Sequence, residues 1–250
     1  NITKHTNHKN YYARNATVYN DKIIYHSGAD IYILNTQSNI YDKVEFDYTS
    51  SKTQASRKFT STQKYLESVS LATSKNFISV ISRGKAFVMG NWNGPVFQFG
   101  EKHGIRYKHS TFFNNDKKIL LVSDKDNKES IEIHTMVSKT IKKSNIDFGR
   151  ILSVKKSPKD DLFIILNHKH ELFLFNPTKD TSIKIDRSKH DFIDSNWSPD
   201  GKYISYNCSI NSRCTIIKIY DLKANKSYNI TKPVNKDFSP VFDPDGKYLS

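Results

Sequence analysis

The chain has 250 residues, of which 36% are hydrophobic and 12% aromatic, and its formal net charge at pH 7 is +14. This is enough for a sizeable core, and no run of about 18 apolar residues is present to span a membrane, so we expect no membrane partner. The charge comes mainly from Lys spread along the chain rather than from Arg, whose side chain reads phosphates and bases bidentately, so we also expect no nucleic-acid partner.

The first 50 residues predict the end of one domain. Asn1-Ile-Thr-Lys4 matches Asn229-Ile-Thr-Lys232, which closes a repeat, so we expect the chain to start inside a repeat. A polar, Ser/Thr-rich stretch at 47–56 then predicts a linker. We place the last unit of one domain with its linker at residues 1–50, and a second domain at 51–250. A longer loop within a single domain is the alternative.

A phrase that occurs twice indicates the architecture. Trp197-Ser-Pro-Asp-Gly-Lys-Tyr-Ile-Ser205 returns as Phe242-Asp-Pro-Asp-Gly-Lys-Tyr-Leu-Ser250. In each copy Pro presets φ, Asp bonds back to the turn and Gly accepts a positive φ, which predicts a strand, a tight turn and a second strand. Weaker copies of this strand-turn-strand motif occur earlier in the chain at a nearly constant spacing. The equivalent positions are 71, 113, 156, 197 and 242.

Each repeat predicts four strands. Runs rich in β-branched and aromatic residues follow the turns at 77–81, 119–122, 162–166 and 203–206. Third runs follow at 86–89, 131–134, 172–175 and 215–220, and short fourth runs at 182–185 and 227–230. Four strands in a repeat of about 40 to 45 residues are typical of a β-propeller blade. We therefore expect an all-β fragment with blades of four antiparallel strands in an incomplete ring, about four and a half of them in residues 51–250.

The propeller prediction also places candidate functional residues. The first strand of each blade is innermost, so the segments before the turns should line an axial channel. Their charged and His residues are Glu67, Arg106, Lys108, His109, Lys155, Asp194, Lys236 and Asp237. A wall with both signs of charge is suited to passing an extended peptide through contacts with its backbone and termini. The alternative is a water-filled structural hole. The turn-flanking Leu71, Phe113, Trp197 and Phe242 are expected to be core side chains between blades.

Motifs for direct chemistry are absent from the sequence. There is no nucleophile elbow, phosphate-binding glycine loop or dinucleotide fingerprint, so we predict no catalytic, cofactor-binding or metal-binding residue. The pairs His5/His8 and His168/His170 lack further ligands and are interpreted as solvated histidines. Cys208 and Cys214 flank a predicted hairpin, and both a disulfide and two reduced thiols remain open.

Three stretches carry a family resemblance. Ile81-Ser-Arg-Gly-Lys-Ala-Phe-Val-Met89 is followed by Gly94-Pro-Val-Phe-Gln-Phe-Gly100 and Gly104-Ile-Arg106, and together they resemble the second propeller of tricorn proteases. Residues 25–32, the linker and Arg57-Lys-Phe59 resemble the passage from the first tricorn propeller into the second, and residues 237–249 are similar to a tricorn blade. The resemblance covers essentially the whole chain.

The resemblance implies a segment of a large serine peptidase that trims peptides. It implies an end of a first propeller at 1–50 and blades of a second, seven-bladed propeller at 51–250, which admits or gates peptide substrates to a peptidase domain later in the same chain. It further implies a cytoplasmic homo-hexamer, with a periplasmic or exported location as the alternative. The catalytic residues belong to the later domain, so none is carried over here. The competing hypotheses are a non-enzymatic TolB-like scaffold that binds a protein partner, and a propeller attached to a prolyl-oligopeptidase-type hydrolase.

Overall fold

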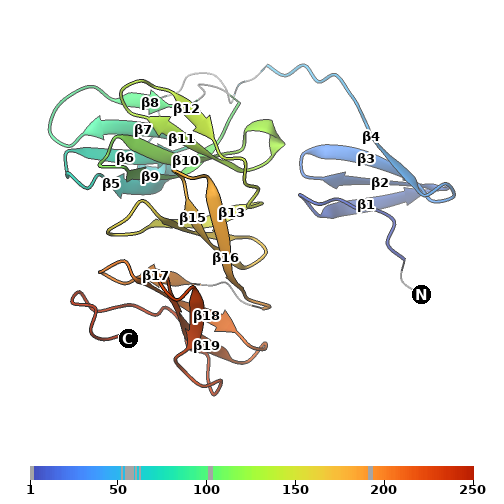
Figure 1. Ribbon diagram of the computed structural model, residues 1–250. Coiled ribbons are helices and arrows are strands. Elements are labelled where there is room, and N and C mark those ends of the chain that lie inside the picture. Colours follow the sequence, from blue (N-terminus) through green and yellow to red (C-terminus); the bar gives the residue numbers. More distant parts are fainter. Residues whose placement is uncertain are drawn as a thin grey trace. The chain divides into compact units, whose positions relative to one another are not determined.

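The computed structural model describes residues 3–51, 53, 59, 61, 63–100, 104–190 and 194–250. The chain divides into two compact units, Asn1–Lys58 and Phe59–Ser250. The described residues form five four-stranded antiparallel sheets, each an up-and-down meander in chain order, one in the first unit and four in the second (Figure 1). They contain no helix with the length and hydropathy of a membrane-spanning segment.

The strands of the five sheets have the following bounds. The first unit holds β1 (Ala13–Tyr19), β2 (Lys22–Ser27), β3 (Asp30–Asn35) and β4 (Ile40–Lys43). After a short 3-10 turn, η1 (Gln63–Tyr65), come β5 (Leu66–Leu71), β6 (Phe77–Ser82), β7 (Lys85–Gly90) and β8 (Phe97–Phe99). The next sheet has β9 (Tyr107–Phe113), β10 (Lys118–Ser123), β11 (Ser130–Thr135) and β12 (Ile141–Lys143), with η2 (Lys125–Asn127) between β10 and β11. Then follow β13 (Ile151–Lys156), β14 (Phe163–Asn167), β15 (Glu171–Asn176) and β16 (Thr181–Arg187). The last sheet has β17 (Ser195–Trp197), β18 (Tyr203–Ser209), β19 (Thr215–Asp221) and β20 (Lys226–Asn229).

The predicted all-β blade is confirmed. Each predicted second, third and fourth run is a strand of the expected rank in its sheet. The two copies of the repeated phrase also share their hydrogen bonds. Ser198 Oγ accepts from the Tyr203 N–H at 2.9 Å, and Asp243 Oδ1 accepts from the Tyr248 N–H at 2.7 Å. Ser and Asp thus act as the same turn-closing acceptor in the two copies.

The central strands β10 and β14 hold neighbouring sheets of the second unit together because both of their faces are buried. In β10, Ile119 and Leu121 join a core with β5–β8, whereas Leu120 and Val122 join a core with β13–β16. Because successive side chains of a strand point to opposite faces, one apolar run supplies two cores. β14 repeats the arrangement, with alternate residues in the cores shared with β9–β12 and with β17–β20. Each core therefore lies between two successive sheets.

The turns between first and second strands are linked from one sheet to the next. The Asp116 carboxylate accepts the backbone N–H groups of Thr73 at 2.9 Å and Ser74 at 2.7 Å, and Asp161 accepts that of Asn114 at 2.9 Å. Burial alone would raise the pKa of Asp116, but the two N–H donors outweigh it and hold this pKa below its usual value. These carboxylates fix the spacing of successive sheets at one end of the stack.

First strands carry a β-bulge at a recurring position. Pairing shifts by one residue between Leu66 and Ser68 in β5 and between Ile151 and Ser153 in β13. Similar shifts interrupt β1 and β9, where Asn15 and His109 have positive φ values of 52° and 53°. A bulge inserts one unpaired residue and bends the strand. Two predicted channel residues, Glu67 and His109, lie at these bulges.

The first unit packs an aromatic cluster against one face of its sheet. His8 lies 4.7 Å from Tyr32 and 5.0 Å from Tyr41 between ring centroids, and its Nε2 is 2.9 Å from the Tyr25 hydroxyl. His8 is thereby a packing residue, and His5 Nδ1 lies 2.8 Å from Asn39 Oδ1.

The predicted core side chains have mixed outcomes. Phe113 is buried, while Trp197 and Phe242 are half-buried. The prediction for Leu71 is wrong, because its side chain is 55% exposed. Leu71 pairs with Ile78 on the face of β5–β8 that points away from β9–β12, and no further sheet of the second unit covers that face in the described residues.

We expect Phe113→Ala to lower the free energy of unfolding by about 3 to 5 kcal/mol, because it opens a cavity in the core between two sheets. The ring of Phe113 is 2% exposed and meets Phe163 edge-on at 5.5 Å. Leu71→Ala is the matched control and should cost less than about 1 kcal/mol. Urea unfolding of both variants measures the difference, and equal losses would contradict the assigned stacking.

Candidate functional site: the first strands

The first strands form a continuous surface in the second unit. β5, β9, β13 and β17 each lie at the edge of their sheet, and β9 contacts both β5 and β13. Of the eight predicted residues, four lie on these strands and two immediately precede one. Lys236 and Asp237 lie outside the named strands, although Lys236 forms an isolated parallel bridge with Thr215. Residues 192–193, also expected here, fall outside the described residues.

Glu67 and Arg106 form an ion pair between neighbouring sheets. Arg106 Nη2 donates to Glu67 Oε2 at 3.0 Å, and the Gly84 N–H donates to Glu67 Oε1 at 3.2 Å. Gly84, with φ +69°, closes the tight β6–β7 turn, and a Cβ there would lie 2.7 Å from Arg106 Cγ. The Arg-Gly pair singled out in the sequence therefore has a structural role, since Gly84 leaves room for Arg106 to cross the hairpin.

Lys108 ties β9 to β13. Its Nζ lies 2.7 Å from Glu129 Oε1 and donates to the Ile151 carbonyl at 2.6 Å. Glu129 in turn accepts the Ile151 N–H at 2.6 Å through its other oxygen. The Lys108 and Glu129 side chains are only 19% and 16% exposed. Sequence reasoning missed Glu129, because it precedes β11 and nothing in the pattern places it beside a first strand.

Lys155 makes the corresponding tie from β13 to β17. Its Nζ donates to the Ser195 carbonyl at 2.7 Å and to Asn196 Oδ1 at 3.1 Å, and it lies 3.3 Å from Asp194 Oδ1. The Trp197 indole N–H donates back to the Lys155 carbonyl at 3.1 Å. Lys155 and Asp194, which were predicted separately, are thus one ion pair across two sheets.

His109 and Asp237 are held within the protein. Burial, aided by the neighbouring Lys108 charge, lowers the pKa of His109 to about 4, so the ring is neutral at pH 7. Asp237 accepts from the Thr231 hydroxyl at 2.5 Å, and its carbonyl accepts from Thr215 Oγ1 at 2.6 Å. The surface of the first strands therefore presents paired or buried charges rather than a field of one sign.

The remaining candidate His and Cys side chains form neither a metal site nor a disulfide in the described residues. The described residues contain no group of three His, Cys, Asp or Glu side chains that could hold a metal ion. Cys208 and Cys214 are free thiols, and Cys208 pairs in register with Ile216 rather than with Cys214. His168 has a structural contact, because its Nδ1 accepts the Arg150 N–H at 3.1 Å.

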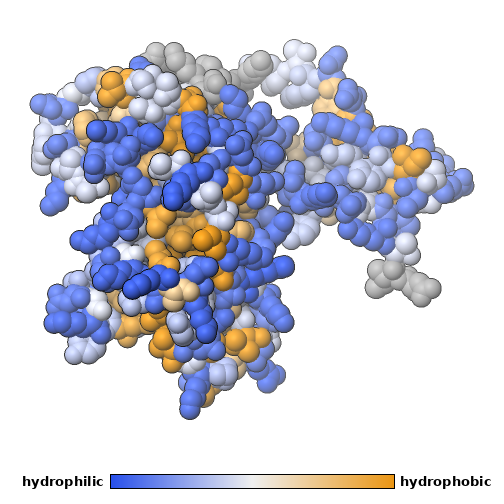
Figure 2. All heavy atoms as spheres, viewed as in Figure 1, coloured by the Kyte–Doolittle hydropathy of each residue, from blue (hydrophilic) through white to orange (hydrophobic). Residues whose placement is uncertain are grey.

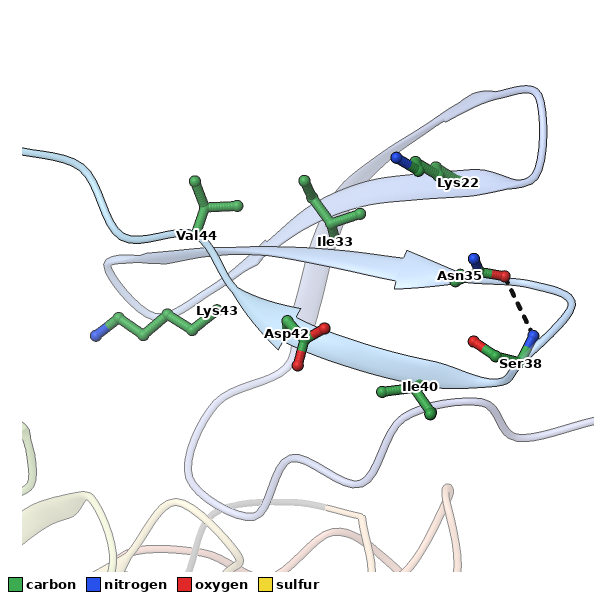
Figure 3. Close-up of a pocket in the computed structure, with 8 residues that line it drawn as sticks. All are labelled: Lys22, Ile33, Asn35, Ser38, Ile40, Asp42, Lys43 and Val44. Carbon is green, nitrogen blue, oxygen red and sulfur yellow. Dashed lines mark hydrogen bonds between the residues drawn. The ribbon is translucent and has the colours of Figure 1, made fainter.

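A hollow of about 480 Å³ lies on the sheet of the first unit (Figure 3). Its charged lining is Lys22, Asp42 and Lys43, and Lys43 pairs with Asp30 at 2.9 Å. Ile33, Ile40 and Val44 supply apolar side chains to it, and the Ser38 N–H bond to Asn35 Oδ1 closes the adjacent turn (Figure 3). The hollow lacks a nucleophile paired with a base, so it offers no catalytic arrangement.

Comparison with known proteins agrees with the propeller-blade architecture. The model of the tricorn protease second β-propeller domain matches residues 66–250. The chain belongs to the tricorn protease family. A tricorn-like protease C-terminal subunit of Sulfurisphaera tokodaii is 35% identical to it over 99% of this chain and 28% of the relative. The chain spans about a quarter of the length of the curated tricorn relatives that it matches.

Solved structures give the same fold for this tricorn-family chain. A crystal structure of tricorn protease superposes with a TM-score of 0.68 at 22% identity, covering 98% of this chain and 24% of that one. TolB from Acinetobacter baumannii superposes with a TM-score of 0.52 at 12% identity, covering 94% and 60%. At these identities the likeness concerns the fold alone. The predicted tricorn resemblance is confirmed by the family match.

His109 should make stability depend on pH. The unfolded ring binds a proton near its usual pKa of about 6.5, whereas the folded ring binds one only near 4, so stability is lost as pH falls between these values. The loss should be on the order of 3 kcal/mol. His109→Gln removes this part of the pH dependence. Urea midpoints at pH 7 and pH 4.5 compare the two proteins, and parallel losses would contradict the assignment.

His168 should be replaceable by Asn but not by Ala. Asn207 in β18 is the equivalent residue, because its N–H bonds to the Asp194 carbonyl as that of His168 does to Arg150. Its Oδ1 accepts the Asp194 N–H at 2.5 Å, as His168 Nδ1 accepts that of Arg150. His168→Ala leaves that N–H without its acceptor and should cost about 1 kcal/mol, whereas His168→Asn should restore most of it. Thermal unfolding of the two variants measures this. Equal destabilisation would show that ring packing, and not the acceptor, matters.

Proposed function

We propose that this chain is a non-catalytic propeller segment of a tricorn-type serine peptidase, and that its first strands line a channel admitting peptide substrates to an active site elsewhere in the protein. The observation that carries the proposal is the pair of ties made by Lys108 and Lys155. Each lysine reaches from one first strand to a backbone carbonyl of the next. Such ties hold neighbouring first strands at a fixed spacing. A fixed spacing suits the lining of a channel of constant width.

The wall should select by width rather than by charge. The charges of Glu67 and Arg106, Lys108 and Glu129, and Lys155 and Asp194 are paired. A peptide near such pairs experiences little net field, so extended chains of varied sequence can pass through contacts with their backbone. Folded proteins would be excluded by their diameter.

The domain boundaries are part of the proposal. We assign residues 1–50 to the last blade of a preceding propeller with its linker, and 51–250 to blades of a second, seven-bladed propeller. The first unit supports this, since its sheet has the meander of the other four and a first-strand bulge like those of β5, β9 and β13. Its Ile24, Ile31 and Ile40 are exposed on one face, as expected of a blade that packs against another.

The tricorn-protease names of the relatives support a peptidase domain in the parent protein. By the same likeness we propose peptide substrates, a homo-hexamer and a cytoplasmic location. The likeness to TolB extends to the fold alone, so a non-enzymatic scaffold is the less favoured function.

A variant that narrows the channel tests the proposal in the full-length protein. Arg106 is 63% exposed at its side chain, so Arg106→Trp adds bulk without removing a buried group. We expect kcat/KM for peptides of about 12 residues to fall roughly tenfold, and kcat/KM for a short chromogenic substrate to stay nearly unchanged.

Lys223→Trp, in the exposed β19–β20 hairpin, is the control for adding a Trp to the surface, and it should leave both substrates unaffected. Equal turnover of long peptides by the Arg106→Trp variant and the parent would rule out a channel along these strands. Absence of any peptide hydrolysis by the full-length protein would favour the scaffold.

A further inference from the structure

The hairpins between third and fourth strands carry exposed apolar side chains in the second unit. Trp92, between β7 and β8, is 95% exposed, and Val137, between β11 and β12, is 91% exposed. Val96 and Ile141 are also more than half exposed. Exposed aromatic and aliphatic groups on adjacent hairpins are characteristic of interaction surfaces.

The two hairpins form one surface. Lys139 places its Nζ 5.8 Å from the centroid of the Phe97 ring, which joins the β11–β12 hairpin to β8. β8 and β12 lie next to each other in Figure 1, in agreement with this contact. Ile141, at the start of β12, continues the surface toward the next hairpin.

A hollow of about 240 Å³ lies beside Ile141, between the β11–β12 and β15–β16 hairpins. The buried side chains of Phe113 and Ile133 contribute to its apolar lining, and Pro177 lines it from the β15–β16 hairpin. Its volume suits one large apolar side chain. Such a concave site is of a kind that anchors a side chain of a protein partner, whereas a lipid surface is contacted by protruding residues.

The charged lining of this hollow has one sign. Lys118 and Lys142 line it, and no carboxylate does. Neither ammonium group forms a salt bridge in the described part of the chain. Asp180 is close enough to Lys142 for its pKa to be lowered by that charge, although burial and hydrogen bonds have larger effects on this pKa. However, the Asp180 oxygens accept from Ser144 Oγ and the Asn145 N–H.

We propose that this surface binds an acidic segment of another protein, which inserts an apolar side chain into the hollow and places carboxylates beside Lys118 and Lys142. Charge complementarity favours this occupant over a second copy docked through the same surface, since the Lys118 and Lys142 charges of the two copies would face each other. The hollow includes Phe113 at the end of β9 but none of the eight predicted channel residues, so the contact does not depend on the proposed channel.

The probe is a fluorescein-labelled peptide of about 12 residues, rich in Asp and Glu with Leu and Phe at intervals, and binding to the complete chain is followed by anisotropy. We expect binding that weakens with salt. Lys118→Gln/Lys142→Gln should weaken it at least about tenfold, and Ile141→Ser several-fold.

Lys169→Gln/Lys223→Gln is the matched control, because it also removes two positive charges, but from exposed positions in other hairpins. It should change binding less than about twofold. Equal weakening by the two double variants, or equal binding of an acidic peptide with Ser in place of Leu and Phe, would overturn the proposal. So would binding of anionic vesicles without binding of the peptide. Circular dichroism of each variant establishes that it is folded.

Discussion

The structure depends on the two-sided burial of its central strands. A sheet whose middle strands are apolar on both faces cannot be stable in water alone, and it gains its stabilisation only when a second sheet covers each face. Ile119 and Leu121 point one way from β10 while Leu120 and Val122 point the other, so the β9–β12 sheet is tied to the sheets on both sides of it, and β14 does the same for the β13–β16 sheet. The stacking, the alignment of the first strands and the spacing of the hairpins all follow from this pattern.

Polar groups then fix how the sheets are spaced. At the turns between first and second strands, Asp116 and Asp161 accept backbone N–H groups of the preceding sheet. Along the first strands, Lys108 and Lys155 reach carbonyl groups of the following sheet. Hydrophobic burial has little directional preference, whereas these bonds have defined partners and geometry. Charged side chains of both signs thus fix the distance and register between neighbouring sheets.

Most of the fold could be predicted from the sequence, because turn chemistry and strand periodicity are local. The Pro-Asp-Gly repeats located the hairpins, and the apolar runs located the strands. The details of the candidate site depend on contacts between sheets, and these are not local. Glu129 and Lys108 meet at the backbone of Ile151, which begins the first strand of the next sheet. Leu71 is exposed because no sheet covers its face among the described residues of the second unit, and His109 is neutral because of burial.

The recurring bulges have a consequence for any extended chain that meets the first strands. An edge strand normally offers an evenly spaced row of backbone donors and acceptors, on which another strand can assemble. The extra residue at Glu67, and again at Leu152, interrupts that row near the start of the strand, so an incoming strand that pairs across the bulge loses register. These edges are therefore shorter templates for a foreign chain than their strands alone suggest, which opposes β-aggregation there.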